Sequence, residues 1–485
     1  MREIAFDSAA SIARRIARGE FSARDALEYF LDRHKRLHPS LNAIVATDIP
    51  KARRRAGAID AALARGERPG PLAGVPMTVK ESFDVAGLPT SWGLEAHRGN
   101  IAARDALVVE RLRAAGAVVW GKSNVPVMLA DWQTFNPVYG TTNSPWGEGL
   151  TPGGSSGGAA SALAAGISAL EYGSDIGGSI RGPSQLCGLY GHKTSYAIVP
   201  GRGHALPGFW SPPEISVVGP LARSAGDLAL ALKATAGPDG NDALAYRLSL
   251  PAPAFDGFRG LRIAVLPSHP ATRVSRVVSD EIVALGRFLA RQGARVKMPV
   301  ALPFDAAEHD RLYVLLRRAA TSMRAFDDAG FRRAVAERET LSADDHGYAA
   351  EQLRGNTLAH REWMLLENER QRLRLAWNDF FRDHDFLLCP GAATVAYPQN
   401  TAGRRWERMI DIDGEPMADV QQIFWMGFAS LGCLPATMAP IAITPGGLPT
   451  GVQIIGPQYA DLSTLRLASL IERQYHAFVP PPGLA

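Results

Sequence analysis

Two short segments rich in glycine and serine lie close together in the sequence and are the first candidates for a reactive site. The first runs from Gly153 to Gly158 and contains Ser155 and Ser156, and the second runs from Asp175 to Arg181 and contains Ser179. Glycine adopts backbone conformations that other residues avoid, and clustered glycines commonly mark turns whose main-chain N–H groups face a ligand. The pattern indicates a site at which main-chain donors meet a ligand.

Several known serine and nucleotide motifs do not fit these segments. Residues 153–157 match G-x-S-x-G, but the preceding WGEGLTPGG is not strand-like, as a nucleophile elbow requires. A phosphate-binding loop fails because His192 separates Gly191 from Lys193. There is no S-x-x-K at either serine and no H-E-x-x-H zinc motif. Serine chemistry whose base lies far away in the sequence remains.

Several ordered motifs resemble those of the amidase signature family, serine hydrolases with a Ser-Ser-Lys triad. The matching segments are GVPMTVKESFDVAG (74–87), NPVYGTTNSPW (136–146), TPGGSSGG (151–158) and YGSDIGGSIRGPSQLCGLYGHK (172–193). Ordered motifs across about 120 residues are far more specific than one short pattern. The resemblance implies an α/β fold in which helices flank a central mixed sheet.

The resemblance assigns a catalytic role to three residues. It implies that Ser179 is the nucleophile, that Ser155 is a bridging serine preceded by a cis peptide bond, and that Lys80 is the base. A lysine accepts a proton at neutral pH only if desolvation lowers its pKa, and the apolar run VPMTV before Lys80 could provide that burial.

Further roles follow from the same resemblance. The main-chain N–H groups expected to stabilise the oxyanion are those of Ile176, Gly177 and Gly178. The side chains expected to hold the reactive loops are Ser156, Asp175 and Arg181. The candidate substrate contacts are Met128, which faces the acyl group in relatives, and the aromatic residues Phe209, Trp210 and Trp425. Aromatic side chains are common in cores as well as in pocket walls, so the sequence leaves both places open for them.

Other reactive residue types receive structural roles. We expect His192 and His204 to satisfy local hydrogen bonds rather than to act in catalysis. We expect Cys187 to be a small buried apolar group. The run from His192 to Ala197 lacks the proline and glycine found in many relatives, so substrate contacts near it are not carried over.

Hydrophobic periodicity predicts alternating helices and strands around these motifs. Helices are expected within residues 8–36, a strand at 72–80, and a buried helix between the two glycine-serine segments. Strand, helix and strand recur across 260–300, and short apolar strands precede a helix at the end of the chain. Residues of about 200–258 are expected to be rich in loops. This alternation predicts an α/β layer architecture.

The domain prediction is a single amidase domain over residues 1–485. Its parts are N-terminal helices at 1–70, a catalytic core at 71–220 and a helical insertion over the sheet at 304–384. The insertion is predicted from long, charged, amphipathic patterns such as EWMLLENERQRLRLAWNDFFRDH.

Composition excludes several other classes of protein. Among 485 residues, 52 basic and 48 acidic side chains are interspersed without a basic tract, so nucleic acid is not an expected partner. Three cysteines are too few for a disulfide framework and lack metal-ligand spacing. We find no signal peptide or spanning segment, and we expect a cytoplasmic protein with no membrane partner, no metal and no cofactor. A homodimer is left open.

The sequence therefore predicts an amidohydrolase that cleaves carboxamides through an acyl-serine intermediate. Its partner is a small amide-type substrate, and the candidate aromatic contacts favour aryl amides. Esters and carbamates are included as further candidate substrates. Two alternatives remain: a glutamine-hydrolysing subunit of a transamidating complex, and a non-catalytic binding protein with an amidase-like fold.

Overall fold

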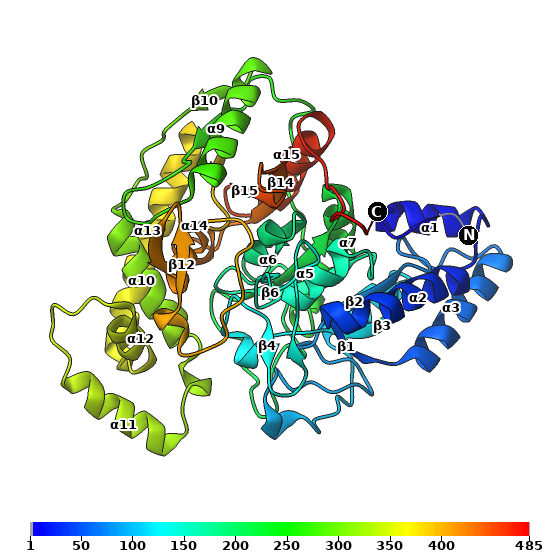
Figure 1. The fold of residues 1–485 in the computed structure, drawn as a ribbon, viewed down its shortest axis with the longest axis horizontal. Helices are drawn as coiled ribbons and strands as arrows, with labels where there is room; N and C mark the ends of the chain where they lie inside the picture. Colours follow the sequence, from blue (N-terminus) through cyan, green and yellow to red (C-terminus); the bar gives the residue numbers. More distant parts are fainter. Residues whose placement is uncertain (1–2, 485) are drawn as a thin grey trace.

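The helices and strands that carry the site are described by a computed structural model of residues 3–484 (Figure 1). The α-helices are α1 (Ala9–Ala17), α2 (Ala23–Leu41), α3 (Ile49–Ala64), α4 (Leu107–Ala114), α5 (Gly157–Ala164), α6 (Arg181–Leu186), α7 (Ala225–Thr235), α8 (Asp242–Ala245), α9 (Arg276–Arg291), α10 (Ala306–Ala319), α11 (Asp328–Glu339), α12 (Tyr348–Asn356), α13 (His360–Asp383), α14 (Phe424–Leu431) and α15 (Asp461–Gln474). The β-strands are β1 (Ile44–Thr47), β2 (Pro76–Lys80), β3 (Val118–Ser123), β4 (Phe135–Asn136), β5 (Gly140–Thr141), β6 (Glu171–Asp175), β7 (Tyr190–Lys193), β8 (Val217–Ala222), β9 (Arg262–Val265), β10 (Arg295–Lys297), β11 (Phe386–Cys389), β12 (Met409–Ile412), β13 (Glu415–Ala418), β14 (Ala436–Ile443) and β15 (Pro449–Ile455).

A mixed sheet of eight strands forms the centre of the molecule. Its strand order is β10-β9-β11-β15-β14-β7-β8-β6. The pairs β10/β9 and β9/β11 are parallel, and the remaining neighbours are antiparallel. A smaller sheet, β1-β3-β2, lies with its strand β2 against the edge strand β6. This contact brings the ends of β2 and β6 together.

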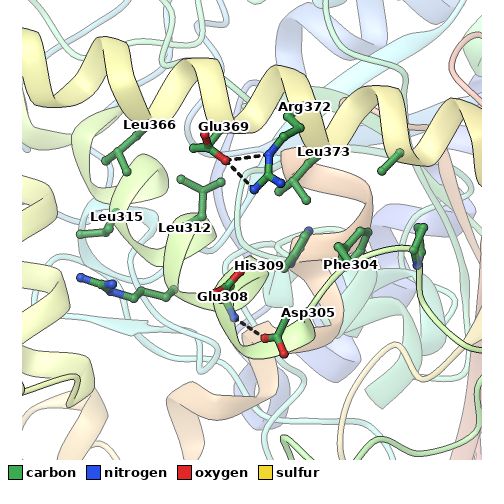
Figure 2. A pocket seen from close by; sticks show the side chains of 13 residues that line it. Phe304, Asp305, Glu308, His309, Leu312, Leu315, Leu366, Glu369, Arg372 and Leu373 are labelled. Carbon is green, nitrogen blue, oxygen red and sulfur yellow. Dashed lines mark hydrogen bonds and ion pairs between the residues drawn. The ribbon is translucent and has the colours of Figure 1, made fainter.

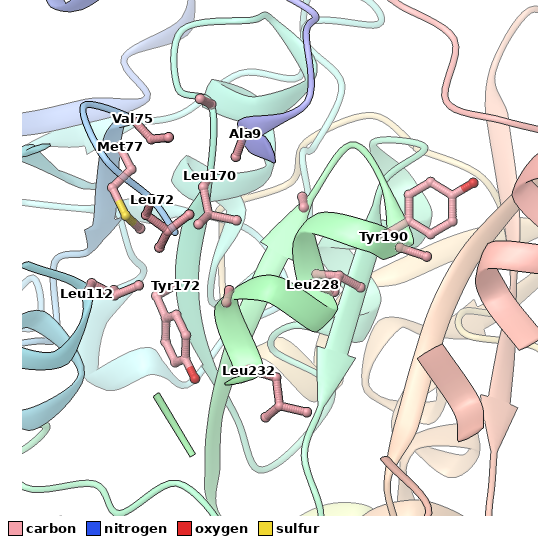
Figure 3. Packing of buried hydrophobic residues seen from close by; sticks show 14 of the residues in the cluster. Ala9, Leu72, Val75, Met77, Leu112, Leu170, Tyr172, Tyr190, Leu228 and Leu232 are labelled. Atoms are coloured by element: carbon pink, nitrogen blue, oxygen red, sulfur yellow. The ribbon is translucent and has the colours of Figure 1, made fainter. Parts of the chain in front are cut away.

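The main hydrophobic core joins the two sheets to their covering helices. Figure 3 shows side chains from α1, α4 and α7 packed over β2, β6 and β7. All eight residues of helix α5 are buried, and all of them except Leu163 are small. A Cβ atom on Gly158 would collide with the backbone of Asn124, so glycine is required for this close approach. Tight packing of α5 fixes the loop that precedes it, which contains Ser155.

Helices α10 to α13 gather at one end of the molecule, and α1 to α3 lie at the other (Figure 1). Helix α10 also contacts α14, which is buried along its length. The four helices occupy the predicted helical insertion. Helix α13 reaches α14 as well, through the buried Trp377, which packs on Phe428.

The structure confirms the predicted fold class, a central mixed sheet flanked by helices. The strands predicted across 260–300 are present as β9 and β10 and belong to this sheet, whereas the strand predicted at 72–80 is β2 of the smaller sheet.

The prediction of a loop-rich segment at 200–258 is wrong for part of its length. Strand β8 pairs with β6 and β7 inside the sheet, and α7 follows it directly. The sequence VVGPLA hides this strand because glycine and proline weaken the usual strand pattern. In the fold, Gly219 allows the close approach of the His192 carbonyl, with which a Cβ atom would collide.

Between residues 3 and 484, none of the helices has both the length and the apolar character that spanning a bilayer requires.

Candidate active site

Ser179 lies in a short loop between strand β6 and helix α6. The loop begins at Ile176, directly after the end of the strand, and the helix begins two residues after the serine. Only 6% of Ser179 is exposed. Both Ser179 and Ser155 line one cavity of about 240 Å³, so two segments separated by a helix and a strand bring their serines to the same space.

Lys80 occupies the last position of β2 and has no exposed surface. Its Nζ atom lies 2.7 Å from Oγ of Ser155 and 3.1 Å from Oγ of Ser174. Burial lowers the pKa of Lys80 to about 7, although the negative charge of Asp175 opposes that shift. The amine is therefore substantially uncharged at neutral pH and is placed to accept a proton from Ser155.

The backbone around Ser155 has the form that the family resemblance implies. The peptide bond between Gly154 and Ser155 is cis. The N–H of Ser156 donates to the carbonyl of Ser179 over 3.2 Å, which links the two serine loops directly. The hydroxyl of Ser156 is buried and has no hydrogen-bond partner among residues 3–484. Ser156 thus supports the site through its main chain.

The loop from Ile176 to Ser179 is held by hydrogen bonds to its carbonyl groups. The phenol of Tyr313 donates to the Ile176 carbonyl over 2.7 Å, and Nε1 of Trp132 donates to the Gly177 carbonyl over 2.8 Å. The N–H and C=O of a trans peptide unit point in opposite directions. Fixing the Ile176 carbonyl therefore also fixes the direction of the Gly177 N–H.

The N–H groups of this loop are not equivalent. That of Gly178 donates to Asp175 over 2.9 Å, so it is not free for an oxyanion, contrary to the expectation from the sequence. The carbonyl of Gly178 accepts from the Gly182 N–H over 2.7 Å, which orients the Ser179 N–H in turn. Within the described chain, the N–H groups of Ile176, Gly177 and Ser179 have no hydrogen-bond acceptor.

Asp175 and Arg181 form a fully buried ion pair beneath the loop. Nη2 and Nε of Arg181 lie 2.7 and 3.0 Å from the two carboxylate oxygens of Asp175. Burial alone would raise the pKa of Asp175, but the charge and hydrogen bonds of Arg181 outweigh it and lower the pKa to about 2. Asp175 also accepts from the N–H of Ile180 over 3.1 Å. The pair holds the loop and does not line the cavity.

The four residues proposed as substrate contacts occupy different places in the structure. Met128 lines the cavity. Phe209 lies outside its wall but packs on Arg324, which lines it. Trp210 is 94% exposed, and Trp425 is fully buried in α14, so neither contacts the cavity. An apolar helix such as α14 buries its aromatic side chains in the core, and the sequence alone did not distinguish core from pocket wall.

The two histidines considered in the sequence make local hydrogen bonds. His192 lies between Thr437 and Asp461, at 2.9 and 3.1 Å. Nε2 of His204 lies 3.0 Å from Oγ of Ser82, and His204 also forms part of the cavity wall. Burial lowers the pKa of His204 well below its ordinary value, with the charge of Lys80 adding to that effect, so the ring is neutral.

Several residues of the site were missed in the sequence. They are Ser174, Trp92, Arg317, Arg318 and Arg324, all of which line the cavity. Ser174 could have been found, because it lies five positions before Ser179 in a matched motif. The three arginines lie within residues 304–384, the predicted helical insertion, where no motif marks them.

A second cavity lies between α10 and α13 and contains no residue of the serine site (Figure 2). Its wall includes His309, which stacks on Phe304 at 4.7 Å between ring centroids. Burial lowers the pKa of His309 to about 3. Across residues 3–484, no group of three or more His, Cys, Asp or Glu side chains is placed to hold a metal ion.

Comparison with known proteins finds relatives over nearly the whole chain. The sequence model of the Amidase family matches residues 25–465. The putative amidase AmiB2 of Mycobacterium tuberculosis is 35% identical over 477 residues, which cover 97% of this chain and 96% of the relative. A glutamyl-tRNA(Gln) amidotransferase subunit of Acidothermus cellulolyticus is 32% identical over 496 residues, with 98% and 95% covered.

Structural similarity leads to the same family. The solved structure of a bacterial aryl acylamidase of the amidase signature family matches with a TM-score of 0.79 and 25% sequence identity, covering 96% of each chain. The sequence match extends over nearly the whole chain, and the fold agrees with it. This chain belongs to the amidase signature family.

Proposed function

We propose that the protein is an amidohydrolase in which Lys80, Ser155 and Ser179 form a proton relay. In the first step Oγ of Ser179 attacks the substrate carbonyl carbon. Its proton passes to Oγ of Ser155 while Ser155 gives its own proton to the neutral amine of Lys80. The carbonyl π electrons move to oxygen, and the N–H groups of Gly177, Ile176 and Ser179 are available to stabilise that negative charge.

Collapse of the tetrahedral intermediate breaks the C–N bond. The leaving nitrogen takes a proton from Ser155, which is reprotonated by the Lys80 ammonium, and the acyl group remains as an ester on Ser179. Water then attacks this ester, and the same relay accepts the water proton and returns one to Oγ of Ser179. The products are a carboxylic acid and an amine, and the enzyme returns to its starting protonation state.

One observation carries this proposal: the buried amine of Lys80 lies 2.7 Å from Oγ of Ser155, and burial holds its pKa at about 7. A protonated, solvated lysine could not act as a base at neutral pH. Ser155 and Ser179 share one cavity wall, so a substrate held there meets both hydroxyls.

The test is replacement of the nucleophile together with a chemical label. Ser179→Ala should lower kcat for anilide hydrolysis by about 10⁴-fold or more, and an activated fluorophosphonate should label Ser179 in the unmodified enzyme. Ser211→Ala is the matched control, because Ser211 is exposed and lies outside this cavity. Undiminished hydrolysis by Ser179→Ala would refute the assignment. Failure of the label to react would support the non-catalytic binding protein instead.

A second candidate is a glutamine-hydrolysing subunit of a transamidating complex. It is favoured by the similarity to the glutamyl-tRNA(Gln) amidotransferase subunit of Acidothermus cellulolyticus, which covers nearly the full length of both chains. This function predicts that purified protein hydrolyses glutamine and that partner subunits co-purify with it. Hydrolysis of anilides by the isolated chain, without glutaminase activity, would exclude it.

A further inference from the structure

Three arginines reach the cavity that contains Ser155 and Ser179. Arg317 and Arg318 lie near the end of α10, and Arg324 ends the 3₁₀ helix η3 (Ser322–Arg324). The cavity wall contains no aspartate or glutamate. In the part of the chain that the structure describes, none of the three guanidinium groups has a carboxylate within 4.0 Å. The positive charge in the wall is therefore not paired locally.

Arg317 and Arg318 share a single acceptor. Both donate through Nη2 to the phenol of Tyr348, over 2.6 and 2.7 Å. The Nε atoms of both side chains are buried without a partner among residues 3–484. A guanidinium group carries five N–H donors, and among residues 3–484 the bond to Tyr348 is the only side-chain hydrogen bond of either arginine. Because the Nε atoms are closed off from solvent, a ligand in the cavity would bind the outer Nη donors.

Arg324 is held by stacking rather than by hydrogen bonds. Its Cζ atom lies 4.9 Å from the ring centroid of Trp92 and 5.2 Å from that of Phe209. Stacking on an aromatic face leaves the N–H groups at the edge of the guanidinium free to bind a planar anion. This accounts for the place of Phe209 behind the cavity wall.

The negative groups nearest to the cavity do not neutralise the positive charge of its three arginines. Burial raises the pKa of Asp310 to about 6, although the positive charge of Arg317 opposes that shift. Burial would also raise the pKa of Tyr348, yet the charges of Arg317, Arg318 and Arg405 lower it to about 7. One carboxylate and a partly ionised phenol thus stand against the three arginines of the cavity wall, since Arg405 has its own carboxylate partner, Asp419, at 3.8 Å. Net positive charge remains beside the cavity.

Arg317 lies against the oxyanion loop itself. A Cβ atom on Gly177 would lie 3.5 Å from Cδ and 3.7 Å from Nη1 of Arg317. An anion bound by this guanidinium is therefore close to the carbonyl that Ser179 attacks. Only a short spacer fits between the two groups in a cavity of about 240 Å³.

We infer that the substrate carries a carboxylate a short spacer away from the scissile amide, and that Arg317, Arg318 and Arg324 bind it. The planar, forked donors of arginine match a carboxylate in two parallel hydrogen bonds. This inference rests on the proposed function, because it names the substrate class of the same site.

The experiment compares matched pairs of anilides on the unmodified enzyme. Succinanilic acid is paired with levulinanilide, in which a methyl ketone replaces the carboxylate, and malonyl and glutaryl homologues extend this pair. For a carboxylate on the leaving amine, 4-acetamidobenzoate is paired with 4-acetamidoacetophenone. We expect kcat/KM for the acid to exceed that for its ketone by about 10²-fold in at least one pair. Equal values in every pair would overturn the inference.

Variants then identify the residues responsible. The measured quantity is the ratio of kcat/KM for acid to ketone, so losses common to both substrates do not enter. Arg317→Gln and Arg324→Gln should each lower this ratio at least about 10-fold. Arg332→Gln is the matched control, since Arg332 is exposed on α11 outside the cavity. An unchanged ratio in both cavity variants would overturn the assignment.

Two measurements keep the result interpretable if a variant does not fold. The preference of the unmodified enzyme should weaken at an ionic strength of about 1 M, where the screening length is about 3 Å, and its persistence would count against an ionic contact. Fluorophosphonate labelling of Ser179 separates the two proposals. A labelled enzyme with no preference for acids overturns only the carboxylate inference, whereas an unlabelled, inactive enzyme overturns both.

Discussion

The Nζ atom of Lys80 lies 2.7 Å from Oγ of Ser155, and neither residue has any exposed surface. Desolvation favours the uncharged form of an amine, so the same burial that brings these atoms together also makes the amine a base. The effect depends on the position of Lys80 at the end of strand β2, PMTVK, whose five residues are all buried. Position and basicity of Lys80 therefore have one structural cause.

The pH dependence of hydrolysis should follow the protonation of Lys80. Only the neutral amine accepts a proton, so kcat/KM for a neutral anilide should rise with pH and be half-maximal near pH 7, where burial sets the pKa of Lys80. Tyr348 also has a pKa of about 7, so Tyr348→Phe is the control and should keep the inflection. Lys80→Arg should abolish activity, because arginine stays protonated. A flat profile between pH 6 and pH 8 would contradict this role.

The phenol of Tyr313 should contribute to catalysis without contacting the substrate. It holds the Ile176 carbonyl and thereby directs the Gly177 N–H, so Tyr313→Phe should loosen one oxyanion donor. We expect kcat to fall about 10-fold, a fraction of the effect of removing a donor outright, with a smaller change in KM. The exposed Tyr246 provides the control variant Tyr246→Phe. A change confined to KM would show that Tyr313 acts on binding instead.

Two neighbouring glycines of the loop should respond differently to alanine. A Cβ atom on Gly178 would lie 2.6 Å from Met426 and 2.7 Å from Trp132, and its φ of +94° is unfavourable for alanine. Gly178→Ala should therefore lower the free energy of unfolding by about 2–4 kcal/mol. At Gly177 the atom nearest to an added Cβ would be 3.5 Å away. Gly177→Ala should therefore change the free energy of unfolding by less than about 1 kcal/mol. Urea denaturation measures both values, and equal losses would contradict this account.

The sequence predicted those site residues that lie in matched motifs. It did not predict features that depend on how distant parts of the chain pack together. Ser155, Ser179 and Lys80 lie in matched motifs, and the structure brings Lys80 to Ser155 and both serines to one cavity. The sequence could not show that the Gly178 N–H is already hydrogen-bonded. That bond depends on the side-chain orientation of Asp175 beneath the loop.

Residues 304–384, the predicted helical insertion, show more clearly what could not be predicted from the sequence. Its amphipathic pattern predicted helices, but three of its arginines face a cavity formed by distant parts of the chain. Charged residues on a helix are usually solvated, so their sequence pattern does not distinguish a surface from a binding site. Likewise, Trp210 and Trp425 each follow a phenylalanine in the sequence, yet Trp210 is 94% exposed and Trp425 is fully buried.

The ion pair of Asp175 and Arg181 should be essential for folding, because both side chains are fully buried. Asp175→Asn leaves the Arg181 charge without its partner and should lower the free energy of unfolding by about 3–5 kcal/mol. The double variant Asp175→Asn/Arg181→Met removes that charge as well and should recover part of the loss. Glu369→Gln is the control, since it breaks an exposed pair with Arg372 and should cost less than about 1 kcal/mol. If the double variant were no more stable than Asp175→Asn alone, the penalty would arise from the lost backbone contacts of Asp175 rather than from the unpaired charge.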